Sequence, residues 1–147
     1  MIIRSLSRLE CTALLLKNRV GYLACVHERQ PYVVPVYFAC QDNRIYAFSM
    51  PGKKIDWMRA NPLVSIFVEE RSNGLEWKSV VVDGSYEELV GHDQRQEAWA
   101  LLSKHPNWWE PGGLKPVTPA LSSHSNHIFF QIRIDQLTGR EAGMGPT

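Results

Sequence analysis

The sequence has no CxxC pair, no long apolar run and almost no net charge. Its three cysteines, Cys11, Cys25 and Cys40, are odd in number and have apolar neighbours, which is typical of reduced thiols that pack as small hydrophobes. No segment approaches the roughly 20 apolar residues of a membrane span, and the N-terminus lacks the basic and apolar regions of a signal peptide. We therefore expect a soluble, unprocessed, cytoplasmic protein.

Charge and missing motifs exclude several classes of function. Sixteen Lys and Arg against fifteen Asp and Glu give a formal net charge of +1, so no global field attracts nucleic acid or an anionic membrane. The esterase elbow Gly-x-Ser-x-Gly, the dinucleotide fingerprint Gly-x-Gly-x-x-Gly and a Walker-type loop are all absent. His124 and His127 have no nearby Cys or carboxylate to complete a metal set. Any anion site must be local, and we predict no metal site.

The patterning predicts one mainly β domain over residues 1–147, with short α-helical inserts. Segments rich in Val, Ile, Tyr and Phe predict six strands over residues 20–27, 32–40, 44–49, 63–70, 77–89 and 127–137. Helical spacing predicts helices over 5–18, 53–61 and 94–104, the first with a capping box of Ser7 and Glu10. Gly84 indicates a bulge or tight bend. Because tight turns rather than crossover helices join most strands, we expect an antiparallel barrel and not a doubly wound sheet.

The run from Ser49 to Lys54 is the strongest candidate for a site. A predicted strand ends there, Pro51 and Gly52 turn the chain, and Lys53 and Lys54 stand in the first turn of a helix. Cations are unfavourable at a helix N-terminus because the helix dipole is positive there. A phosphate would reverse that effect, since first-turn N–H groups, two ammonium groups and the Ser49 hydroxyl could converge on it. The alternative is that both lysines are merely solvated.

Five stretches together resemble the pyridoxamine 5'-phosphate oxidase-like flavin-binding superfamily, and in particular its small flavin-nucleotide-binding branch, which includes the nitroimidazole resistance proteins. They are Gly21–Ala24, Pro31–Phe38, Ile45–Pro62, Trp77–Gly84 and, more weakly, Ile132–Arg140. The resemblance implies a six-stranded antiparallel split β-barrel, FMN as the cofactor, and a homodimer with two flavin sites at the subunit interface.

The resemblance also implies which residues bind the cofactor. The phosphate would be held by Ser49, Lys53 and Lys54, and the flavin ring would lie along residues 34–37, where a strand edge offers backbone donors and acceptors. Pro35 suits an edge because it cannot donate to a ladder. The full predicted set is Val34, Pro35, Val36, Tyr37, Phe48, Ser49, Lys53, Lys54, Trp77 and Ser79. Trp77 and Ser79 would approach the phosphate or ring from the same or the other subunit, with core packing as the alternative for Trp77.

The first functional hypothesis is an FMN-dependent oxidoreductase acting on a small organic substrate, with no catalytic residue assigned. A non-catalytic module that stores, senses or delivers flavin is the alternative, and a split barrel holding deazaflavin or haem is a third.

Nitroimidazole resistance proteins characteristically carry a histidine where this chain has Phe48 and Ser49, so a nitroreductase activity is not implied. Neither the basic flavin motif nor the C-terminal segment of true pyridoxamine phosphate oxidases is present. The adjacent Trp108 and Trp109 include a candidate cover for the flavin or substrate.

Overall fold

A computed structural model describes residues 1–104 and 127–143 of the chain. Its elements, in chain order, are β1 (Ile2–Ser5), α1 (Arg8–Lys17), β2 (Val20–His27), β3 (Gln30–Tyr37), β4 (Ala39–Gln41), β5 (Arg44–Ser49), α2 (Lys53–Ala60), β6 (Leu63–Arg71), β7 (Trp77–Leu89), α3 (His92–Leu102) and β8 (Ile128–Gly143). None of the helices in these ranges has the length and apolar character needed to span a membrane.

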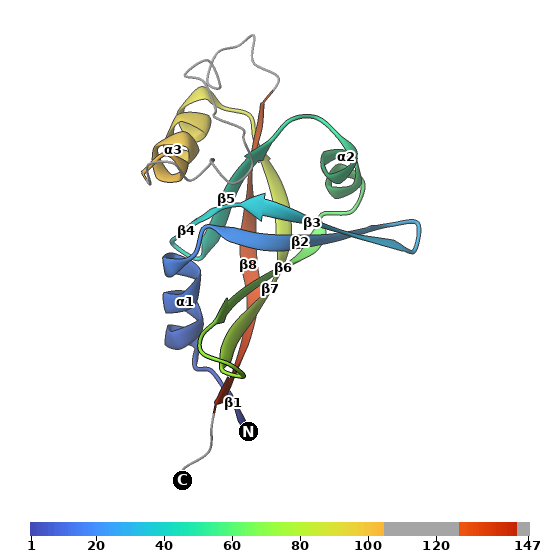
Figure 1. The fold of residues 1–147 in the computed structure, drawn as a ribbon. Coiled ribbons are helices and arrows are strands. Elements are labelled where there is room, and N and C mark those ends of the chain that lie inside the picture. Colours follow the sequence, from blue (N-terminus) through green and yellow to red (C-terminus); the bar gives the residue numbers. More distant parts are fainter. Residues whose placement is uncertain (105–126, 144–147) are drawn as a thin grey trace.

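The strands form one antiparallel sheet in the order β3-β2-β6-β7-β8-β5-β4, with β1 paired to the far end of β8 (Figure 1). The sheet curls until β3 contacts β5, as a split barrel requires. This confirms the predicted fold class. The strand count was wrong, because eight strands replace the expected six. The predicted strand over 32–40 breaks at Phe38, whose N–H donates to the carbonyl of Arg19 at 2.9 Å, and its last residues form β4.

Two-residue turns set the register of both N-terminal hairpins. Glu28 and Arg29 have φ of 50° and 70°, and Asp42 and Asn43 have φ of 52° and 62°. Two consecutive positive φ angles give a turn whose twist matches the flanking strands. In the first hairpin His27 therefore pairs with Gln30, and the register continues to Val20 opposite Tyr37.

Helix α2 is anchored by the main core. Ile55 and Met58 are both fully buried, and they pack with inward-facing side chains of the sheet such as Leu23 and Ile66. At the other end of the helix, Arg59 forms a two-bonded ion pair with Glu88 of β7 at 2.8 and 3.2 Å. The buried face and the ion pair at the last turn thus hold α2 in place against the sheet.

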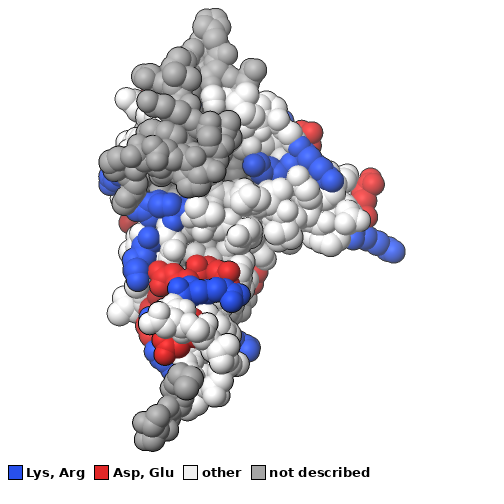
Figure 2. All heavy atoms as spheres, viewed as in Figure 1, with Lys and Arg blue, Asp and Glu red and all other residues white. Residues whose placement is uncertain are grey.

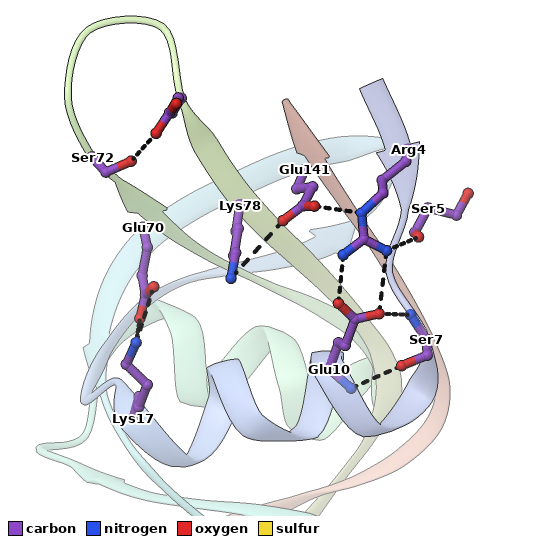
Figure 3. Close-up of polar contacts among 10 residues, drawn as sticks. Arg4, Ser5, Ser7, Glu10, Lys17, Glu70, Ser72, Lys78 and Glu141 are labelled. Carbon is purple, nitrogen blue, oxygen red and sulfur yellow. Dashed lines mark hydrogen bonds and ion pairs between the residues drawn. The ribbon is translucent and has the colours of Figure 1, made fainter. Parts of the chain in front are cut away.

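Acidic and basic side chains lie close together on the face of the molecule in Figure 2, and an ion-pair network ties the N-terminus to β8 and α1 (Figure 3). Arg4 contacts Glu141 and bonds Glu10 at 2.7 Å. Glu10 also completes the predicted capping box with Ser7, with both of its bonds at 3.1 Å. Hydrogen bonding, first from Arg4 and then from Ser7, lowers the pKa of Glu10 from 4.5 to about 2.

We expect Glu10→Gln to lower the free energy of unfolding at pH 7 and to have less effect at pH 3. A carboxylate whose pKa is lower in the folded state stabilises fully above its unfolded pKa, here 4.5, and this contribution is lost as the pH falls towards 2. Urea unfolding at the two pH values measures the difference. Glu97→Gln is the control, because Glu97 is exposed on α3 and forms no ion pair with a described residue. An equal loss for Glu10→Gln at both pH values would contradict this assignment.

Candidate functional site

The corner between β5 and α2 has the local geometry that the sequence predicts. Strand β5 ends at Ser49, and α2 begins at Lys53 with Gly52 as its N-cap. The carbonyl of Gly52 accepts the N–H of Asp56 at 3.0 Å, but Gly52 has no side chain to cap the first turn. The Ser49 hydroxyl donates to the carbonyl of Met50 at 2.9 Å and would have to rotate to donate to an anion. The first turn of α2 therefore presents N–H groups without a side-chain acceptor among the described residues.

The first turn of α2 contains two lysines, Lys53 and Lys54, and one acidic residue, Asp56. Lys53 is exposed and Lys54 is half-buried. Within residues 1–104 and 127–143, neither forms an ion pair with a carboxylate. Burial lowers the pKa of Lys54, which reflects the cost of holding a charged ammonium there. A bound anion would offset this unfavourable charge.

Lys53 connects the corner to β3. Its Nζ lies 4.4 Å from the centre of the Tyr32 ring and 4.6 Å from that of the Trp57 ring. Tyr32 belongs to β3 and Trp57 to α2, and the two ring centres are 5.5 Å apart. Val34 follows two residues after Tyr32 on the same face of β3, about 7 Å further along the strand. The basic corner and the predicted ring-binding strand are thus contiguous.

Strand β3 is an edge strand, as the prediction for Pro35 requires. It pairs with β2 and lies at the end of the sheet. The pair His27 and Gln30 flanks the two-residue turn and is hydrogen-bonded, and hydrogen-bonded and non-hydrogen-bonded pairs alternate from there along the hairpin. The backbone groups of Val33 and Pro35 therefore point away from β2. Val34 is half-buried, and the side chain of Val36 is in the core at 7% exposure. A ligand along this edge would therefore meet the backbone groups of Val33 and Pro35, because the same alternation directs the backbone of Val36 towards β2.

Phe48 precedes Ser49 at the end of β5. Phe48 packs in an aromatic cluster with Trp99, His127 and Phe129, at ring distances of 5.5 to 6.1 Å. Trp108, Trp109 and His124 lie outside the described residues.

Trp77 and Ser79 lie at the opposite end of the sheet from the corner. Ser49 at the corner pairs with Ile128 at the start of β8, whereas Ser79 pairs with Arg140 near the end of β8. The twelve steps between Ile128 and Arg140 span about 40 Å of strand, and Trp77 pairs two residues further along. One chain alone does not bring Trp77 or Ser79 to the basic corner.

Two residues at the corner, Tyr32 and Trp57, are absent from the predicted site. Trp57 lies beside apolar neighbours in the sequence, which is typical of a packing residue, but it also lies four residues after Lys53 on the same face of α2. That spacing is a signal that the sequence does contain. Tyr32 carries no such signal, because its contact with Lys53 depends on how α2 packs against the first hairpin.

Comparisons with known proteins agree with this architecture. The family model described as pyridoxamine 5'-phosphate oxidase matches residues 7–141. An uncharacterized protein of Rhizobium meliloti strain 1021 is 50% identical over 149 residues, covering 99% of each chain. The structure of an FAD-binding protein from Mesorhizobium loti shares 56% identity over 97% of this chain and 100% of that one, with a TM-score of 0.81. A candidate 5-nitroimidazole antibiotic resistance protein from Bacteroides thetaiotaomicron has the same fold at 18% identity and a TM-score of 0.74, over 96% of this chain and 89% of that one.

Proposed function

The chain belongs to the pyridoxamine 5'-phosphate oxidase family, and we propose that it binds a flavin nucleotide whose riboflavin 5'-phosphate lies at the corner of Ser49, Lys53 and Lys54. The observation that carries this proposal is the first turn of α2, where two lysines and free N–H groups have no carboxylate partner among the described residues. A phosphate would receive charge-assisted hydrogen bonds from the two lysines and from the N–H groups of the first turn.

The flavin at this corner would be FMN or FAD. The family resemblance of the sequence implies FMN, whereas the Mesorhizobium loti protein of 56% identity is named FAD-binding. Both nucleotides contain the riboflavin 5'-phosphate, which is the group that the corner would bind. Heat release of the flavin from the purified protein, followed by chromatography against FMN, FAD and riboflavin standards, identifies which of the two is held. Protein that retains no flavin and binds neither nucleotide on titration would overturn the proposal.

We propose further that the bound flavin makes the protein an oxidoreductase for a small organic substrate. The flavin would supply the hydride or electron transfer, and the residues of this chain would bind and orient it. Anaerobic mixing with NADH or NADPH, followed by nitro and quinone acceptors, tests this activity. Flavin that stays oxidised with both donors, or whose reduced form passes no electrons to any acceptor, would support the non-catalytic carrier instead.

A second copy of the chain is the partner that we propose. The outer face of β2, β3 and the start of β6 carries exposed apolar side chains, namely Val20, Tyr22, Val26, Val33 and Leu63, which are 40 to 67% exposed. Contiguous apolar surface of this kind is typical of an interface. A homodimer would also supply a second Trp77 and Ser79, which lie far from the corner within one chain.

We expect Val33→Glu to weaken this dimer by at least about tenfold, because a carboxylate would be buried without a partner in the interface. Val33 is 60% exposed in the single chain, so the change should leave the monomer fold intact. Sedimentation velocity at several protein concentrations measures the effect. Leu9→Glu is the control, since Leu9 is 80% exposed on α1, away from this face. A monomeric wild-type protein, or a Val33→Glu dimer as tight as wild type, would contradict the proposed interface.

A further inference from the structure

We propose that Tyr32 and Trp57 are positioning residues that hold the Lys53 ammonium at the corner and thereby raise the preference for phosphorylated over unphosphorylated flavin. This inference rests on the proposed flavin-nucleotide site. It assigns a role to two aromatic side chains that the predicted site does not include.

The geometry places one cation against two rings from different elements. The Nζ of Lys53 lies 4.4 Å from the ring centre of Tyr32 and 4.6 Å from that of Trp57, within the roughly 6 Å of a cation–π contact. The two rings meet edge to face at 61°. The His27 ring packs on Trp57 with its centre 5.5 Å away. Both rings also pack against the main core, so each is held independently of Lys53.

Rings hold an ammonium group without cancelling its charge. A carboxylate at the same distance would fix Lys53 equally well, but it would neutralise the charge and compete with a phosphate. The ring quadrupole attracts the cation and carries no net charge. An exposed lysine samples many rotamers, and confining it near its ligand before binding reduces the entropy lost on binding. The clamp formed by Tyr32 and Trp57 therefore orders Lys53 while leaving its charge for an anion.

The neighbouring lysine is held in a different way. Lys54 is half-buried, and no ring contact with a described residue involves it. Loss of the clamp should consequently act through Lys53 alone. A general packing role for Trp57 would not depend on Lys53, so dependence on Lys53 distinguishes the two roles.

The first test compares FMN and riboflavin binding in ring variants. We expect Trp57→Leu and Tyr32→Leu each to weaken FMN binding about threefold to tenfold and to leave riboflavin binding within about twofold of wild type. Trp57→Phe and Tyr32→Phe keep a ring face, and we expect both to retain most of the FMN affinity. Fluorescence quenching of the free flavin measures each dissociation constant. Equal losses for FMN and riboflavin, or no rescue by the phenylalanine variants, would overturn the clamp.

A double-mutant cycle then separates positioning from packing. If Trp57 acts through Lys53, Trp57→Leu should cost no further FMN affinity in a Lys53→Ala background. The same loss in both backgrounds would show that Trp57 acts by another route and would refute the proposal. The cycle also separates this inference from the one it rests on. If Lys53→Ala and Lys54→Ala leave the ratio of FMN to riboflavin affinity unchanged, the phosphate corner itself is wrong.

Discussion

Replacing Lys53 and Lys54 together with alanine is expected to weaken FMN binding at least about a hundredfold while leaving riboflavin binding nearly unchanged. Each lysine would donate a charge-assisted hydrogen bond to the phosphate, and hydrogen bonds to charged groups contribute about 1.5–3 kcal/mol each. Riboflavin lacks the phosphate, so the loss should be confined to the nucleotide. Titration of the flavin-free protein with each ligand gives both dissociation constants.

The control for this double variant removes the same charge from another part of the molecule. Arg8→Ala and Lys17→Ala, both on α1, remove two positive charges without changing the corner. We expect this pair to keep the FMN affinity within about threefold of wild type, because surface charges act weakly through water and salt. Equal weakening of FMN and riboflavin in the lysine variant would show that the lysines support the fold and do not bind a phosphate.

Gly84→Ala is expected to destabilise the protein by roughly 2–4 kcal/mol. The register between β7 and β8 shifts between Asp83 and Gly84, which confirms the predicted bulge. A methyl group at this position would collide with the backbone carbonyl of Arg133 and lie 2.7 Å from the side chain of Ile132. Because backbone cannot move aside as a flexible side chain can, the two long strands would have to separate locally. Urea unfolding of the flavin-free protein measures the loss.

Gly143→Ala is the matched control for that substitution. Gly143 lies at the end of β8, where a methyl group would meet no atom of the described residues within 4 Å. We expect the free energy of unfolding to change by less than about 0.5 kcal/mol. A Gly84→Ala variant as stable as Gly143→Ala would mean that the bulge does not require glycine.

Local sequence signals predicted much of the fold. The bounds of β5 and β7, the capping box at Ser7 and the bulge at Gly84 all agree with the structure. Each of these depends on residues close in sequence, such as alternating apolar side chains or a cap three residues before its partner. Strand β1 was missed because its four residues are all exposed, and β4 was not recognised as a separate strand because three residues carry too little pattern. They exist because β8 and β5 offer them edges to pair with.

In the candidate site, too, the features that depend on neighbouring residues could be predicted. The basic corner could be predicted because Ser49, Lys53 and Lys54 lie within six consecutive residues. The edge position of Pro35 could be predicted because proline has no N–H to donate to a neighbouring strand. The contact of Tyr32 with Lys53 depends on the packing of α2 against the first hairpin, which no local pattern encodes. The distance between Trp77 and the corner likewise follows from the length of β8, because Ser49 and Trp77 pair with its opposite ends. Whether Trp77 and Ser79 contribute from a second subunit stays a prediction.

A crystal structure of the protein with its flavin nucleotide bound would show where the phosphate lies. We predict a riboflavin 5'-phosphate within hydrogen-bond distance of Lys54 Nζ and of the first-turn N–H groups of α2, with the ring along the free edge of β3. We also predict that Lys53 contacts the phosphate while its ammonium remains against Tyr32 and Trp57. A flavin phosphate bound away from α2, with both lysines in solvent, would contradict the proposed phosphate site.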